Sequence, residues 1–112
     1  MTWAAAKAAC EGLGKTLAVP IDVIENSAVY TNWNGNNFGY WIGVTDAAVD
    51  GTWLDIGGNA ISYNNFAEGK PDGATAKNCV VTGLGETWAD EDCTLARQYI
   101  CQGNFLVKKL DF

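Results

Sequence analysis

The first stretch of the chain carries its hydrophobic residues at helical spacing. Residues 3–13 are rich in alanine, a strong helix former, and Thr2 is a plausible N-terminal cap. Gly14 is expected to end this helix. Trp3, Lys7 and Cys10 follow one another at i, i+4 and i+7, so they share a face. The pattern therefore predicts a helix that points Cys10 into a core.

A second helix is predicted from a capping pattern. Asp22 is followed three residues later by Glu25, which is typical of a capping box. The helix is expected to run to about Trp33, where residues 34–37, Asn-Gly-Asn-Asn, break it.

Beyond this point the hydrophobic pattern changes to that of strands. Residues 40–44 form an apolar run that predicts a buried strand, and Asp50-Gly51 predicts a turn before a strand at 52–55. Residues 64–77 have the composition of a long loop. Three more strands are expected at 79–82, 86–89 and 98–101. Helices followed by antiparallel strands indicate an α+β domain.

Length and composition limit the domain organisation and the partners. The 112 residues are expected to form one domain, with 48% hydrophobic residues to build a core. The net charge of −6 argues against nucleic acid and against anionic membrane surfaces. No apolar run approaches the ~18 residues that a membrane span needs, so we expect no membrane insertion.

The four cysteines predict two disulfides in an oxidising compartment, and hence a secreted or extracellular protein. Spacing alone allows three pairings. The chain opens on a helix rather than on an apolar signal segment, which favours a processed export product or an excised domain. The alternative is a cytosolic chain with thiols bound to zinc, but no C-x2-C spacing supports it.

The absence of histidine bears on catalysis. It removes the commonest general base, and with it any Ser-His or Cys-His nucleophile pair. The carboxylates stand in no recognisable catalytic frame. The sequence therefore predicts a binding module rather than an enzyme.

Four short motifs follow one another along the chain, each occurring once. They are Trp-Ile-Gly-Val at 41–44, Trp-Leu-Asp at 53–55, Lys-Pro-Asp at 70–72 and Trp-Ala-Asp at 88–90. Together with the cysteine-bearing first helix, they resemble the C-type lectin-like domain family over nearly the whole chain. Residues 43–66 look most like the mannose-binding collectins. The resemblance implies disulfides Cys10–Cys101 and Cys79–Cys93.

One departure from the family concerns its first strand. Members usually open with a strand that pairs with the last one, and here Met1 starts too late to supply it. Gly103-Asn104 is a hairpin signal, and Phe105 to Leu110 has strand composition. We expect residues 105–112 to be a C-terminal extension whose strand takes that place; the alternative is a frayed tail.

The sugar site of the family is altered in this chain. In sugar-binding members, calcium is held by oxygen ligands from the long loop and from the late strand. By resemblance, Lys70, Lys77 and Ala89 stand where three of these ligands belong, whereas Asp72 and Asp90 are retained. A charged lysine donates hydrogen bonds and does not ligate calcium.

These substitutions suggest a different arrangement of the loop. Lys70 and Lys77 are expected to neutralise Asp72 and Asp90 in place of the ion. A second calcium position of the family would involve Asp46, Asp50 and Asn78, although aspartates bracketing a turn explain the first two equally. We therefore predict no required cofactor, with calcium as the alternative at Asp72, Asp90 and Asn78.

The predicted function is recognition of a glycan or a protein at a surface through the loop at 64–77. The expected ligand-binding residues are Lys70, Asp72, Lys77, Trp88 and Asp90. Alternatives are a calcium-dependent lectin with a Lys-Pro-Asp motif and an ice- or mineral-binding protein. Trp41, Trp53 and Trp88 are predicted to pack in the core, whereas Trp33, Phe38 and Tyr40 are expected to be partly exposed. Glu91 and Asp92 are interpreted as turn residues. No motif specifies the ligand or the oligomeric state.

Overall fold

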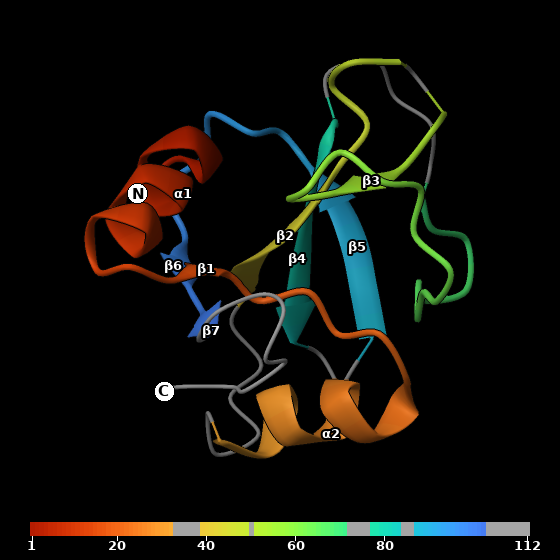
Figure 1. Cartoon of the computed structure of the whole chain (residues 1–112). Coiled ribbons are helices and arrows are strands. Elements are labelled where there is room, and N and C mark those ends of the chain that lie inside the picture. The colour runs from red at the N-terminus through yellow and green to blue at the C-terminus, as the bar shows by residue number, and fades with distance from the viewer. Residues whose placement is uncertain (33–38, 50, 72–76, 84–86, 103–112) are drawn as a thin grey trace.

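The computed structural model of the chain describes residues 1–32, 39–49, 51–71, 77–83 and 87–102. Their elements run helix, strand, helix and then six strands (Figure 1). In Figure 1, α1 lies on one side of the central strands, the loop after β3 lies on the other side, and α2 lies across one end. This arrangement confirms the predicted α+β class.

The first helix, α1 (Trp3–Gly12), begins and ends at the predicted signals. The Ala5 amide donates to the Thr2 hydroxyl over 3.2 Å, which satisfies one of the free amides of the first turn. At the other end, the amide of Gly14 donates to Glu11 and that of Lys15 donates to Cys10. Gly14 has φ of +73°, so this is a Schellman ending that glycine favours.

The second helix, α2 (Val23–Asn32), starts from the predicted capping box. The Asp22 carboxylate accepts from the Glu25 amide over 2.8 Å, and the Glu25 carboxylate accepts from the Ile21 amide over 3.4 Å. The expected end at Trp33 lies one residue beyond the helix and outside the described residues.

The central sheet has the order β3-β2-β4-β5, formed by β3 (Leu54–Asp55), β2 (Tyr40–Thr45), β4 (Cys79–Gly83) and β5 (Thr87–Glu91). These neighbours are antiparallel, and β6 (Gln98–Tyr99) adds to β2 in parallel. A separate pair joins β1 (Thr16–Leu17) to β7 (Cys101–Gln102). Because β2 is the middle strand, its residues are buried from Tyr40 to Val44.

The observed strands differ from the predicted ones at several points. The strand expected at 52–55 covers only Leu54–Asp55, and β1 was not predicted at all. The last strand divides at Ile100, whose carbonyl accepts from Ala18 and whose amide donates to Trp41. The chain there changes partners from β2 to β1, which a strand pattern in the sequence does not reveal.

The prediction that Tyr40 is partly exposed is wrong. Tyr40 is 3% exposed and packs with Ala18 and Ile100. The reason is that β6 pairs with the start of β2, so the first residue of the apolar run is covered as well. Trp33 and Phe38, expected to be exposed beside it, lie outside the described residues.

The core lies on both faces of the central sheet. On the α1 side, Trp41 and Leu17 pack with Ala6 and Cys10 of the helix. On the other side, Ile42, Val44, Val80 and Trp88 pack under aromatic residues of the loop after β3. Alternation along each strand divides its side chains between these two faces.

Both disulfides implied by the family resemblance are present. Cys10 is joined to Cys101, which ties α1 to β7, and Cys79 is joined to Cys93, which ties β4 to the turn after β5. Both predicted pairings are therefore confirmed.

The predicted replacement strand at 105–110 and its hairpin at Gly103-Asn104 lie outside the described residues, so both stay predictions. Met1 exchanges two hydrogen bonds of 2.9 Å with Arg97, just before β6. Across the part of the chain that is described, neither helix combines the length and the apolar character needed to span a bilayer.

Candidate functional site

Strand β5 sends its alternate side chains to opposite faces of the sheet. Trp88 and Asp90 are both 0% exposed, and Trp88 belongs to the cluster beneath the loop after β3. Ala89 instead packs against the cluster that contains Trp41 and α1. The position that resembles the family's asparagine is therefore turned away from the loop.

Trp88 is the centre of the packing beneath the loop. Its indole N–H donates to the Asn26 side-chain oxygen of α2 over 2.7 Å, and this hydrogen bond is buried. The rings of Tyr63 and Phe66 lie nearly perpendicular to the Trp88 ring at centroid distances of 5.8 and 5.7 Å, and the Trp53 ring lies 5.4 Å from that of Phe66. Such tilted pairs fix ring orientation. Trp88 thus supports the loop from below and is not itself at the surface.

The loop is also joined to β5 through the backbone. The Trp88 amide donates to the Asn65 carbonyl, and the Ala67 amide donates to the Trp88 carbonyl, both over 2.9 Å. A turn follows in which Gly69 has φ of +79° and the Lys70 amide donates to Ala67 over 2.8 Å. Through these contacts, the buried strand β5 fixes the position of the turn that carries Lys70.

Lys70 lies at the edge of a pocket of about 530 Å³. The pocket combines half-buried aromatic walls with a cation and with polar groups. Its lining residues are Gly51, Thr52, Trp53, Ala60, Ile61, Asn64, Phe66, Lys70 and Pro71. A concave surface of this size and mixed chemistry suits a small ligand or a protruding part of a larger one.

The described residues do not fit the family's loop calcium site. Calcium needs six to eight oxygen ligands, several of them charged. Lys70 and Lys77 are cations, Ala89 has no oxygen and faces α1, and Asp90 is a single carboxylate. Among the described residues, no three His, Cys, Asp or Glu side chains gather in a way that could hold a metal ion. Asp72, the other retained candidate, lies outside these residues.

The second predicted calcium position contains a turn. Asp46 is 4% exposed and accepts from the Gly51 amide over 2.8 Å, which is how an aspartate closes a turn. The Asn78 carbonyl accepts from the Asp46 amide and from the Thr45 hydroxyl, so this backbone oxygen serves the sheet. Asp50 lies outside the described residues.

Asp92 follows β5 at the start of the turn, as interpreted from the sequence, whereas Glu91 is the last residue of β5 and pairs with Cys79, so its interpretation as a turn residue is wrong. Glu91 pairs with Arg97 at 2.6 Å. The Asp92 carboxylate accepts from the amide of Thr94 over 2.9 Å and from its hydroxyl over 2.7 Å. The backbone hydrogen bond, followed by the hydroxyl, lowers the pKa of Asp92 below 3.8 because both stabilise the charged form.

The structure brings only some of the predicted site residues to one place. Lys70 lies at the pocket, Trp88 lies beneath it, and Asp90 is buried on β5 opposite Val80. Lys77 lies two residues before β4, which begins at Cys79. A lysine-centred cluster requires Asp72 as well, so it stays a prediction.

Sequence reasoning did not identify two contributors to this site. Asn26 reaches Trp88 across 62 residues, and the sequence signal was only a polar residue within a short amphipathic helix. Thr52 forms part of the pocket from the turn before β3. The Asp50-Gly51 turn signal placed the turn correctly but carried no information on what it faces.

Comparison with known proteins identifies the family. The model of the lectin C-type domain matches residues 1–103. Human tetranectin is 37% identical over 101 residues, which cover 83% of this chain and 50% of tetranectin. A tetranectin-like protein from Carcharhinus perezii is 34% identical over 104 residues, which cover 88% of this chain and 62% of that protein. The chain thus spans about half the length of the curated relatives it matches.

Solved structures share the fold. The human scavenger receptor C-type lectin carbohydrate-recognition domain superposes with a TM-score of 0.84 at 23% identity, covering 90% of this chain and 81% of that one. A Ca2+-dependent type II antifreeze protein gives 0.82 at 24%, covering 90% and 82%. A calcium-independent type II antifreeze protein gives 0.81 at 25%, covering 90% and 77%. The same fold is therefore found in calcium-dependent and calcium-independent proteins.

The family model covers all of the described residues, and the human relative shares more than a third of its aligned sequence with this chain. The chain belongs to the C-type lectin domain family and is a recognition module of that family.

Proposed function

We propose that this domain binds a glycan or a protein ligand through the Lys70 pocket of the long loop, without the family's usual calcium-dependent sugar site. The observation that carries the proposal is the position of Lys70. This cation lies at the edge of a pocket walled by Trp53 and Phe66, where the family resemblance would place a calcium ligand.

The chemistry of the pocket supports such a ligand. A lysine ammonium donates up to three hydrogen bonds, which suits sugar hydroxyls or protein carbonyls and carboxylates. Half-buried aromatic side chains offer apolar faces for the ring of a sugar or for an apolar side chain. Asn64 adds a carboxamide that both donates and accepts.

The proposal assigns indirect roles to the other predicted residues. Trp88 and Asp90 are buried, so they would support the loop rather than contact the ligand. Lys77 and Asp72 would complete a neutralised cluster in place of the ion. Asn78, whose carbonyl serves the sheet, would hold β4 in place.

A glycan and extracellular-protein array, probed with and without the chelator EGTA, tests the proposal. We expect binding that EGTA leaves unchanged and that Lys70→Ala lowers by about tenfold, since hydrogen bonds to charged groups are worth ~1.5–3 kcal/mol. Lys7→Ala is the matched control, because Lys7 pairs with Glu11 on α1. Loss of binding in EGTA would instead support the calcium-dependent alternative with its Lys-Pro-Asp motif. If the Lys70→Ala variant binds as tightly as the unmodified domain, the Lys70 pocket is not the binding site.

Ice binding is a second candidate function, favoured by the structural likeness to type II antifreeze proteins of both calcium classes. It would appear as a difference between freezing and melting temperatures in a nanolitre osmometer. Equal freezing and melting temperatures in a millimolar solution of this domain would exclude ice binding.

We also propose that the module acts outside the cell and without catalysis. Two disulfides support an oxidising compartment, and the relatives in the family are binding proteins. The absence of histidine supports a non-catalytic role. Residues 1–112 would form one domain, with 105–112 as the extension that replaces the family's first strand.

A further inference from the structure

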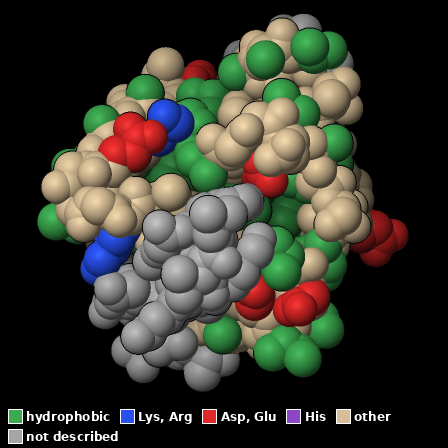
Figure 2. Space-filling model, viewed as in Figure 1, with side chains coloured by type: hydrophobic (Ala, Val, Ile, Leu, Met, Phe, Trp, Pro, Cys, Tyr) green, Lys and Arg blue, Asp and Glu red, His purple; other side chains and the backbone are tan. Residues whose placement is uncertain are grey.

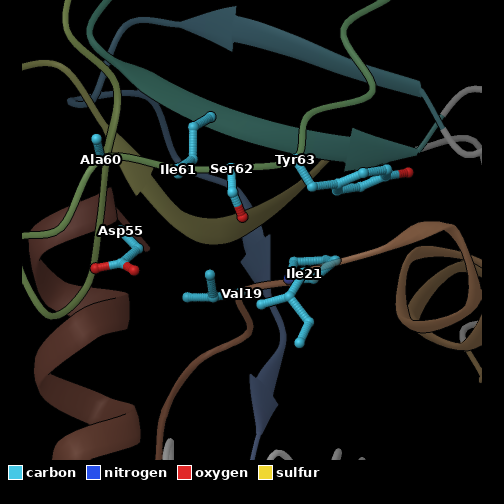
Figure 3. Close-up of a pocket in the computed structure, with 8 residues that line it drawn as sticks. Val19, Ile21, Asp55, Ala60, Ile61, Ser62 and Tyr63 are labelled. Atoms are coloured by element: carbon cyan, nitrogen blue, oxygen red, sulfur yellow. The ribbon is translucent and has the colours of Figure 1, made fainter.

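A second pocket, of about 310 Å³, shares Ala60 and Ile61 with the lining of the Lys70 pocket. It separates the connection between β1 and α2 from the segment that follows β3. Figure 3 shows Val19 and Ile21 on one wall, Ile61, Ser62 and Tyr63 on the opposite wall, and the Asp55 carboxylate at one end. Pro20 and Ala60 complete the lining.

The two walls are held by defined backbone contacts. The Val19 amide donates to the buried Gln102 side chain over 2.9 Å, and the Ile21 amide donates to Glu25. On the opposite wall, the Ile61 amide donates to the Trp53 carbonyl over 3.2 Å. The pocket is therefore formed before any ligand arrives, which lowers the entropic cost of binding.

Asp55 is held rigidly with one oxygen uncommitted. Its Oδ1 accepts from the amides of Gly57 over 2.9 Å and Asn59 over 3.0 Å, within a turn in which Gly58 has φ of +82°. Oδ2 makes no hydrogen bond to any residue that the structure describes. The turn thus fixes the carboxylate while leaving an acceptor for a ligand.

The electrostatic surroundings favour a cation. Asp55 is the charged residue among the described residues of the lining, and no lysine or arginine belongs to it. Asp22 and Glu25 lie next to Ile21 at the start of α2. Figure 2 shows acidic and apolar side chains together over this helix. Exposed carboxylates attract cations at long range and do so less at high salt.

We propose that this pocket binds a primary ammonium group carried on an unbranched aliphatic stem. The stem would pack along Val19 and Ile21, while the ammonium would donate to Asp55 Oδ2. Apolar walls with one fixed acceptor at the end match a chain of methylene groups that ends in a charge. The group has two sources, a free alkylamine or a lysine side chain of a protein.

Titration of the 15N-labelled domain with n-butylammonium, followed by two-dimensional NMR, tests the proposal. The expected result is saturable shifts of the Val19, Ile21, Ile61 and Ser62 amides, with a Kd on the order of millimolar for so small a ligand. The neutral 1-butanol and the anionic butyrate have stems of similar length. We expect both to bind about tenfold more weakly or worse, because only the ammonium pairs with Asp55.

Two variants locate the site. Asp55→Asn keeps the acceptor for the Gly57 and Asn59 amides while removing the charge, and we expect it to weaken butylammonium binding by about tenfold or more. Asp92→Asn is the matched control, since it removes one charge from a similar turn outside the pocket. Ser62→Leu changes an exposed residue and should block the pocket by its volume.

A second titration distinguishes the sources. Binding of Nα-acetyl-lysine methylamide that is lost on Nε-acetylation supports a protein lysine, and binding of butylammonium alone supports a free amine. The proposal is overturned if neither amine shifts the pocket amides, if 1-butanol matches butylammonium, or if Asp55→Asn binds as tightly as Asp92→Asn.

Discussion

Single residues show how the loop is held. Trp88 was predicted to pack in the core, and its full burial confirms this interpretation. Its partner Asn26 could not be predicted, because a hydrogen bond across 62 residues depends on how α2 meets the sheet. One buried side chain of α2 thus supports the aromatic rings that form the wall of the Lys70 pocket.

Replacing Asn26 by alanine is expected to lower the free energy of unfolding by ~1–3 kcal/mol. The substitution leaves the Trp88 indole N–H buried without its acceptor, which is where the cost arises. Urea denaturation followed by tryptophan fluorescence measures the change. Ser27→Ala, one position along the same helix, should shift the midpoint far less, and equal midpoints for the two variants would contradict the argument.

The secondary-structure elements divide into those with local signals and those without. Thr2, Gly14 and Asp22 begin or end helices through hydrogen bonds to near neighbours, so their sequence patterns were sufficient. Strand β1 has only two residues, and its existence depends on pairing with β7 far along the chain. Tyr40 was misjudged for the same reason.

The middle strand β2 depends on a close approach at Gly43. Its amide donates to the Ala18 carbonyl over 2.7 Å. A Cβ at this position would meet the Leu17 carbonyl oxygen and a Val19 methyl, each at 3.0 Å. The connection that forms one wall of the Asp55 pocket therefore lies directly against a glycine of the central sheet.

Gly43→Ala is therefore expected to destabilise the domain by ~1–3 kcal/mol, the usual cost of overpacking, because the backbone oxygen of Leu17 cannot rotate away. Thermal unfolding by circular dichroism measures it. Gly12→Ala is the control, since nothing lies within 4 Å of its added Cβ and alanine favours the helix. A destabilisation by Gly12→Ala equal to that by Gly43→Ala would refute the explanation.

At the scale of the whole molecule, two disulfides tie the elements at different ranges. Cys10–Cys101 spans 91 residues and joins α1 to β7, whereas Cys79–Cys93 spans 14 and joins β4 to the turn after β5. In the chain-entropy model, the longer link restricts the unfolded chain more, by ~4.6 against ~3 kcal/mol.

Removing the long disulfide by a Cys10→Ala and Cys101→Ala pair is expected to cost ~1.5 kcal/mol more than removing the short one in the same way. Denaturant unfolding of both double variants gives the difference, with the unmodified domain as reference. The order of the two losses is the test, and a larger loss for the Cys79–Cys93 pair would show that native packing outweighs chain entropy.

The sequence by itself determined the helices, most of the strands and, through its motifs, the family and the disulfide pairing. These follow from spacing between near neighbours and from residues in a fixed order. Only the tertiary structure decided that Ala89 faces α1, that Trp88 supports the loop from beneath, and that Asp55 lies at the end of an apolar pocket. Each of these depends on which faces of distant segments meet, and the free energy of that packing is not contained in any local pattern.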